Sequence, residues 1–204
     1  VLKNHETQET IVETLENGVR FCMYPEGTHR PKHSLQPLGK GVFRAALAAN
    51  AKFGNERPVY IIPTGIEYGD YFRYRSTALV TLGKPINVTE YVNNHKDENE
   101  AIVINGLREI LTERMANLIS YIPDNEENYE AIWEMTKIKS GLKGSLEERR
   151  NRNQKIIKEI LEWKEREPEK AEEKFKEVEK FIKKRKKKGI SVTSVTKKNI
   201  VGTV

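Results

Sequence analysis

A short polar segment, residues 24–30, holds residue types that could bind a phosphorylated ligand. It reads Tyr-Pro-Glu-Gly-Thr-His-Arg and follows an apolar run. Gly27 would let a ligand approach the backbone closely, and Thr28 offers a hydroxyl. His29 and Arg30 offer cationic or potentially cationic groups, which suit a phosphate. Taken alone, the segment is better explained as a surface turn with incidental charge.

The elements around this segment change that interpretation. Hydrophobic spacing and Gly/Pro positions predict helices over 7–17 and 41–53 and strands over 19–24, 59–62 and 78–82. Alternation of helix and strand predicts an α/β fold with a partly parallel sheet flanked by helices. The segment then belongs to a loop, residues 25–39, at the carboxyl end of a strand, where such folds bind ligands. The helix that begins at Gly41 adds free amides and its dipole to an anion site. Cys22, within the first strand, is predicted to be a core residue.

The second half of the chain is predicted to be helical. Apolar spacing predicts helices over 98–122, 129–137, 146–163 and 169–188. Residues 1–140 hold 16 basic and 19 acidic residues, whereas residues 141–204 hold 20 and 11. We therefore predict two parts, an α/β part over 1–140 and a charged, basic helical extension over 141–204. The basic run 183–188 fits an anionic membrane surface first and a solvated helix end second. Nucleic acid is not expected as a partner.

Composition excludes several classes of protein. No apolar run approaches the roughly 20 residues of a membrane-spanning helix, and residues 1–16 do not form a signal peptide. A single cysteine excludes an internal disulfide and any multi-cysteine metal site. We expect no metal site and no bound cofactor.

The arrangement of these blocks resembles the glycerolipid acyltransferase family, typified by the bacterial 1-acylglycerol-3-phosphate acyltransferases. Glu26-Gly27-Thr28 matches the family's Phe-Pro-Glu-Gly-Thr-Arg-Ser block, and Ile62-Pro63-Thr64 is similar to its later Val-Pro-Val block. The resemblance covers residues 1–90 and does not explain the extension. His29 stands where the family has arginine, and Arg30 follows one position later.

The resemblance implies a function in phospholipid synthesis. An acyl group would pass from acyl-CoA or an acyl carrier protein to the hydroxyl of a lysophosphatidate-like glycerol phosphate. The acceptor would be bound by Glu26, Gly27, Thr28, His29 and Arg30. In this assignment Glu26 supports the loop, Gly27 allows close approach, and Arg30, or less directly His29, binds the phosphate. The protein would act peripherally at the cytoplasmic face of the membrane.

The family's catalytic block, His-x-x-x-x-Asp, does not occur in this sequence. The residues five positions after its four histidines are Thr10, Ser34, Leu38 and Glu100. In the family the block precedes the Glu-Gly-Thr segment, so we expect these residues to be the carboxyl-terminal part of a longer enzyme. We predict no catalytic residue here and no turnover by the 204 residues alone. Two alternatives are an inactive lipid- or phosphate-binding module of the same fold and a helical extension that binds a partner protein.

Overall fold

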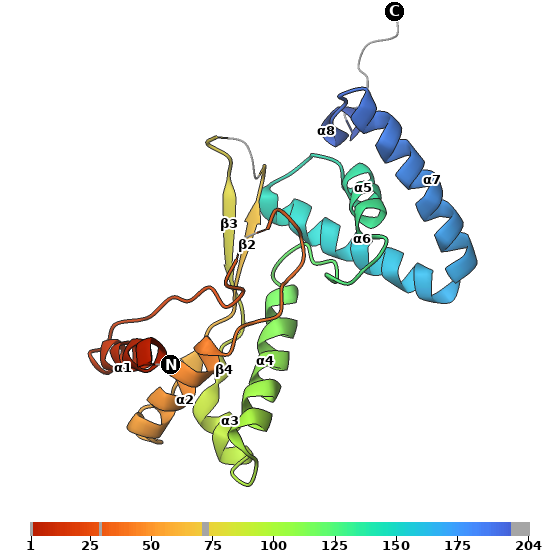
Figure 1. The fold of residues 1–204 in the computed structure, drawn as a ribbon. Coiled ribbons are helices and arrows are strands. Elements are labelled where there is room, and N and C mark those ends of the chain that lie inside the picture. The colour runs from red at the N-terminus through yellow and green to blue at the C-terminus, as the bar shows by residue number, and fades with distance from the viewer. Residues whose placement is uncertain (1, 29, 71–73, 197–204) are drawn as a thin grey trace, which may run out of the picture. The chain divides into compact units, whose positions relative to one another are not determined.

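The computed structural model describes residues 2–28, 30–70 and 74–196. In that part the chain is mixed α/β, with eight helices and two two-stranded sheets (Figure 1). The helices are α1 (Leu2–Glu16), α2 (Gly41–Phe53), α3 (Val88–Asn94), α4 (Glu100–Ala116), α5 (Tyr129–Ser140), α6 (Leu146–Arg166), α7 (Pro168–Lys187) and α8 (Val192–Thr196). The strands are β1 (Tyr60–Ile61), β2 (Thr64–Tyr68), β3 (Ala78–Leu82) and β4 (Ile86–Asn87).

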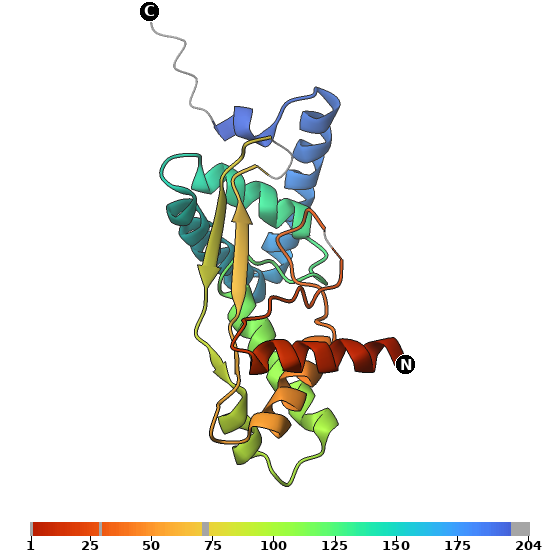
Figure 2. The same ribbon diagram turned by 90° about the vertical axis from the view of Figure 1, so that its left-hand side faces the viewer.

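The strands that the structure describes pair in antiparallel fashion. β1 pairs with β4 in the register Tyr60–Asn87 and Ile61–Ile86. β2 and β3 lie side by side and run in opposite directions (Figure 2). The mixed α/β class is therefore confirmed, but the predicted parallel component is not among the described strands. β2 and β3 are consecutive, and the nine residues between them are too few for the crossover that parallel strands need.

The segment 19–24 is the clearest departure from the predicted elements. It forms no strand, and Val19 and Phe21 are 55% and 46% exposed. Cys22 is also exposed, so the prediction that it is a core residue is wrong. A strand requires a neighbouring strand to take its backbone hydrogen bonds, and no other described segment pairs with this one.

Contacts divide the chain into two compact units. Unit 1 comprises residues 1–31, 35–65 and 81–118, and unit 2 comprises residues 32–34, 66–80 and 119–204. The predicted division after residue 140 rests on the change in charge composition there, and it stays a prediction. α5 lies before that position, yet it packs against α6 and α7 in one unit.

Unit 1 is built on α2, which contacts α1, α3 and α4. Phe43 and Ala49 on α2 are fully buried, as are Val88 on α3 and Leu107 on α4. The start of β2 packs closely against Leu118, two residues after the end of α4. A Cβ added to Gly65 would lie 2.5 Å from the Cβ of Leu118. This position therefore accepts only glycine without a shift of the backbone.

Unit 2 has a core between α5, α6 and α7. Its buried residues include Ile132, Ile157 and Phe175, and the two tryptophans of the chain pack at its edge. α6 begins with a capping box, in which the Ser145 hydroxyl accepts from the Glu148 amide and the Glu148 carboxylate accepts from the Ser145 amide. Pro168 occupies the first turn of α7, where its missing N–H costs no hydrogen bond. No described helix is long and apolar enough to cross a bilayer.

Candidate functional site: the loop between residues 25 and 39

The candidate site is a loop whose two ends belong to unit 1 and are held together. The Gly39 amide donates to the Pro25 carbonyl at 2.7 Å. A Cβ on Gly39 would lie 3.3 Å from the same oxygen, so the backbones at the two ends of the loop are in close contact. This contact places the turn at Glu26 beside the residues that begin α2.

The Glu26 side chain connects the two sides of the loop. Its carboxylate accepts a hydrogen bond from the Gln36 amide at 2.9 Å. The Gln36 side chain in turn donates to the Thr28 hydroxyl at 2.9 Å and to the Thr28 carbonyl at 3.2 Å. Three residues thus connect the two sides of a compact loop. Sequence analysis missed Gln36, because a glutamine between a leucine and a proline carries no signal of such a contact.

Gly27 and Thr28 form the exposed rim of this loop. The Gly27 amide donates to the Tyr24 carbonyl at 3.3 Å, which closes a turn, and Gly27 has a φ of 68°. A side chain would be strained at that angle, so glycine is required by the turn as well as by any approaching ligand. Arg30 is half-buried, and His29 lies outside the described residues.

The first turn of α2 follows the loop directly. Lys40 is the N-cap residue, and its side chain accepts no hydrogen bond from the helix. The first amides of α2 are therefore not capped by that side chain, and the helix dipole favours an anion at this end. The loop and this helix end together offer amides, a hydroxyl and cationic groups within one stretch of unit 1.

Lys32 and His33 belong to unit 2, although they follow Arg30 closely in the sequence and lie within the loop 25–39. The Lys32 ammonium lies 3.8 Å from Asp124 and 5.0 Å from the centre of the Tyr129 ring. His33 stacks on Trp133 with ring centres 3.9 Å apart, and its amide donates to the Tyr129 hydroxyl. Both residues therefore anchor the chain within unit 2.

His33 also meets a buried polar network. Its Nδ1 lies 3.5 Å from Oε1 of Glu67. The Glu67 carboxylate accepts from the Ser120 amide at 2.9 Å and from the Ser120 hydroxyl at 3.0 Å. Ser120 is fully buried, and its hydroxyl accepts a further hydrogen bond from the side-chain amide of Asn153. Because Ser120 is fully buried and its hydroxyl is engaged by Glu67 and Asn153, it is not accessible to a substrate, and we interpret this network as structural.

Burial lowers the pKa of His33 below its ordinary value, an effect that Lys137 reinforces and Glu67 opposes. A depressed pKa in the folded state means that stability is fully present above pH 6.5 and is lost as the pH falls. We expect the free energy of unfolding to decline from pH 7.5 to 5.5, by at most about 1.4 kcal/mol per pH unit. Urea denaturation across this range measures it. His33→Gln should flatten the slope, and an equal slope in the variant would contradict the assignment.

Among the described residues, no group of His, Cys, Asp and Glu side chains is arranged to hold a metal ion.

Comparisons with known proteins agree with the resemblance seen in the sequence. Residues 2–67, which include the whole loop, match the family model described as Acyltransferase. An uncharacterized acyltransferase of Schizosaccharomyces pombe is 26% identical over 113 residues, 55% of this chain. Glycerol-3-phosphate O-acyltransferase 2 of Saccharomyces cerevisiae is 27% identical over 132 residues, 64% of this chain. The matched region spans 17% of the length of each relative. No solved structure matches the chain significantly. The predicted resemblance to glycerolipid acyltransferases is thus confirmed.

Proposed function

We propose that this chain, whose residues 2–67 belong to the acyltransferase family, supplies the acceptor-binding part of an enzyme of glycerolipid synthesis. The acceptor is a glycerol phosphate with a free hydroxyl, such as lysophosphatidate. Glycerol 3-phosphate is the acceptor in the name of the Saccharomyces cerevisiae relative. The observation that supports the proposal is the closed loop 25–39, because it lies within the matched region and carries groups of the kind that suit a phosphate.

Each residue of the loop has a distinct part in this proposal. Glu26 holds the loop closed through Gln36 and leaves the exposed Gly27 and Thr28 to meet the ligand. Arg30, with His29 beside it in the sequence, provides the positive charge for the phosphate. The uncapped amides of α2 add a second source of positive potential.

The reaction itself needs groups that these residues do not include. The acceptor hydroxyl attacks the thioester carbonyl of acyl-CoA or an acylated carrier protein, a base removes its proton, and the thiol leaves. We propose that a His-x-x-x-x-Asp block outside these 204 residues provides the base. The chain alone should then bind the acceptor without turnover, and no cofactor is required.

The exposed apolar residues of unit 1 support a larger sheet in the complete protein. Val19, Phe21, Tyr60, Ile62 and Leu82 are large and exposed. In the proposed enzyme, segment 19–24 becomes a strand of the partly parallel sheet, because a neighbouring strand would bury its alternate residues and satisfy its backbone.

We propose a peripheral position at the cytoplasmic face of the membrane. Lys183, Lys184, Lys187 and Lys188 are exposed at the end of α7, and clustered lysines are attracted to anionic lipids. Arg185, by contrast, is engaged with Glu134 inside unit 2. The membrane-facing charge of the run is therefore smaller than its sequence suggests.

A binding module without catalysis is the alternative function. Turnover by the complete gene product that contains this chain separates the two, because a module binds the acceptor and transfers no acyl group.

Titration calorimetry on the 204-residue chain tests the acceptor site. We expect saturable binding of glycerol 3-phosphate, none of glycerol, and at least tenfold weaker binding by Arg30→Gln, because a charge-assisted hydrogen bond contributes about 1.5–3 kcal/mol. Arg20→Gln removes an exposed arginine of the same unit and serves as the control. Lysophosphatidate in a parallel titration distinguishes the two acceptors. Equal affinities for glycerol and its phosphate would contradict the proposal.

A further inference from the structure

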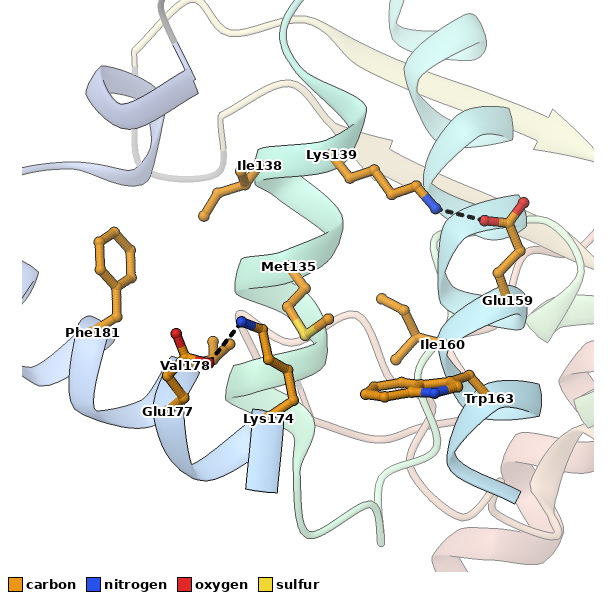
Figure 3. Close-up of a pocket in the computed structure, with 10 residues that line it drawn as sticks. All are labelled: Met135, Ile138, Lys139, Glu159, Ile160, Trp163, Lys174, Glu177, Val178 and Phe181. Carbon is orange, nitrogen blue, oxygen red and sulfur yellow. Dashed lines mark hydrogen bonds and ion pairs between the residues drawn. The ribbon is translucent and has the colours of Figure 1, made fainter. Parts of the chain in front are cut away.

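A groove in unit 2 lies between three helices. It has a volume of about 550 Å³, which is in the range of small-molecule sites. Its lining residues come from α5, α6 and α7 and are mostly apolar: Met135, Ile138, Lys139, Glu159, Ile160, Trp163, Lys174, Glu177, Val178 and Phe181. Figure 3 shows Trp163 at one end of this groove and Phe181 and Ile138 at the other.

The charged side chains of the groove neutralise one another. The Lys139 ammonium lies 2.8 Å from the Glu159 carboxylate, and Lys174 lies 2.7 Å from Glu177 (Figure 3). The interior therefore presents apolar surface between two ion pairs at its rim. Phe181 and Ile138 are each 40% exposed, so the apolar surface reaches solvent at one end.

Positive charge lies beyond that open end. The ridge of α7 that lines the groove runs through Lys174, Val178 and Phe181. Steps of three and four residues extend this ridge to Lys184 and Lys188, both exposed. Along α7, the apolar lining of the groove is thus followed by the exposed cationic side chains of Lys184 and, at the C-cap, Lys188.

We propose that this groove binds a single-chain anionic amphiphile, with its acyl chain along the trough and its anionic head at Lys184 and Lys188. Charge complementarity favours an anion at the open end, and apolar lining favours a hydrocarbon chain. Size argues against a protein partner, because ten lining residues are fewer than the roughly 20–30 a side of a standard interface. The site goes beyond the proposed acceptor loop, which lies in the other unit.

Dodecyl phosphate below its micellar concentration is the probe, and the emission of Trp163 reports its binding. Trp163→Phe assigns the signal, because Trp133 is the other tryptophan. Each buried methylene contributes about 0.8 kcal/mol, so decyl phosphate should bind roughly tenfold more weakly. Inorganic phosphate should not bind. Excess glycerol 3-phosphate should not displace the probe, so this proposal and the acceptor loop can fail separately.

Substitutions at the open end of the groove test where the hydrocarbon chain and the anionic head of the ligand lie. Phe181→Asp should weaken binding of dodecyl phosphate at least tenfold, and Ile138→Asp provides a second variant on α5. Ile102→Asp changes an apolar residue of α4 that is 50% exposed, and it should have no effect. Lys184→Gln with Lys188→Gln should weaken dodecyl phosphate severalfold but leave dodecyl maltoside unchanged. Lys183→Gln with Lys187→Gln removes the same charge about 100° around the helix from Lys184 and Lys188, off the ridge that lines the groove, and is the matched control.

Several results would overturn the proposal. One is an affinity for alkyl phosphates that does not depend on the length of the alkyl chain. Another is binding of dodecyl phosphate that neither Phe181→Asp nor Ile138→Asp weakens. A third is a protein that binds anionic vesicles but does not bind monomeric dodecyl phosphate. Sedimentation that shows a dimer dissociated by Phe181→Asp would assign the groove to a second copy of the chain instead.

Discussion

Replacing Glu26 with alanine is expected to weaken binding of glycerol 3-phosphate by the 204-residue chain at least tenfold. The Glu26 carboxylate is the acceptor for the half-buried Gln36 amide, and a buried donor left without a partner costs about 1–3 kcal/mol. The loop would open, and Gly27 and Thr28 would no longer be held in place for the ligand. Titration calorimetry measures the loss, and turnover should fall in the complete enzyme.

Two matched variants separate this effect from a general loss of charge. Glu26→Gln keeps an oxygen that can accept from the Gln36 amide, so it should retain most of the affinity. Glu56→Ala removes an exposed carboxylate of the same unit and should leave binding unchanged. Wild-type affinity in Glu26→Ala would show that the closed loop is not needed for binding.

Replacing Arg185 with alanine is expected to lower the free energy of unfolding of unit 2 by about 3 kcal/mol. The Arg185 guanidinium donates to both oxygens of the Glu134 carboxylate, at 2.6 and 2.8 Å, and to the Ile190 carbonyl. The two side chains are only 11% and 7% exposed. Removing one partner leaves the other as an uncompensated buried charge, which is the costly case.

Tryptophan fluorescence during urea denaturation measures this stability, because both tryptophans lie in unit 2. Lys183→Ala, two residues earlier and exposed, should change the free energy of unfolding by less than about 0.5 kcal/mol. Arg185→Met combined with Glu134→Leu removes both charges and should recover much of the loss. Equal stabilities for Arg185→Ala and Lys183→Ala would mean that the ion pair does not form in solution.

Local patterns were sufficient to predict most helices and one strand. The helix over 41–53 and the strand over 78–82 have the predicted bounds, because alanine-rich helical spacing and alternating residues both act over short range. The two helices of the extension are also confirmed. α3 was not predicted: its N-cap Asn87 is also the last residue of the two-residue strand β4, and the helix has only seven residues.

Long-range pairing was not available from the sequence. The run 19–24 has the composition of a buried strand, but a strand also depends on a neighbour, and none of the described segments provides one. Likewise, the sequence groups Lys32 with Arg30, although contacts place Lys32 in unit 2 and Arg30 in unit 1. The basic run 183–188 gave no sign that Arg185 is held by Glu134, 51 positions earlier.

The position of the acceptor is the central claim, and amide shifts in a ¹H–¹⁵N NMR titration with glycerol 3-phosphate test it most directly. The account predicts that the largest shifts fall on the amides of Gly27, Thr28 and Gly41, while those of unit 2 stay unchanged. No shift in residues 25–41 at saturating ligand, or shifts confined to unit 2, would contradict it.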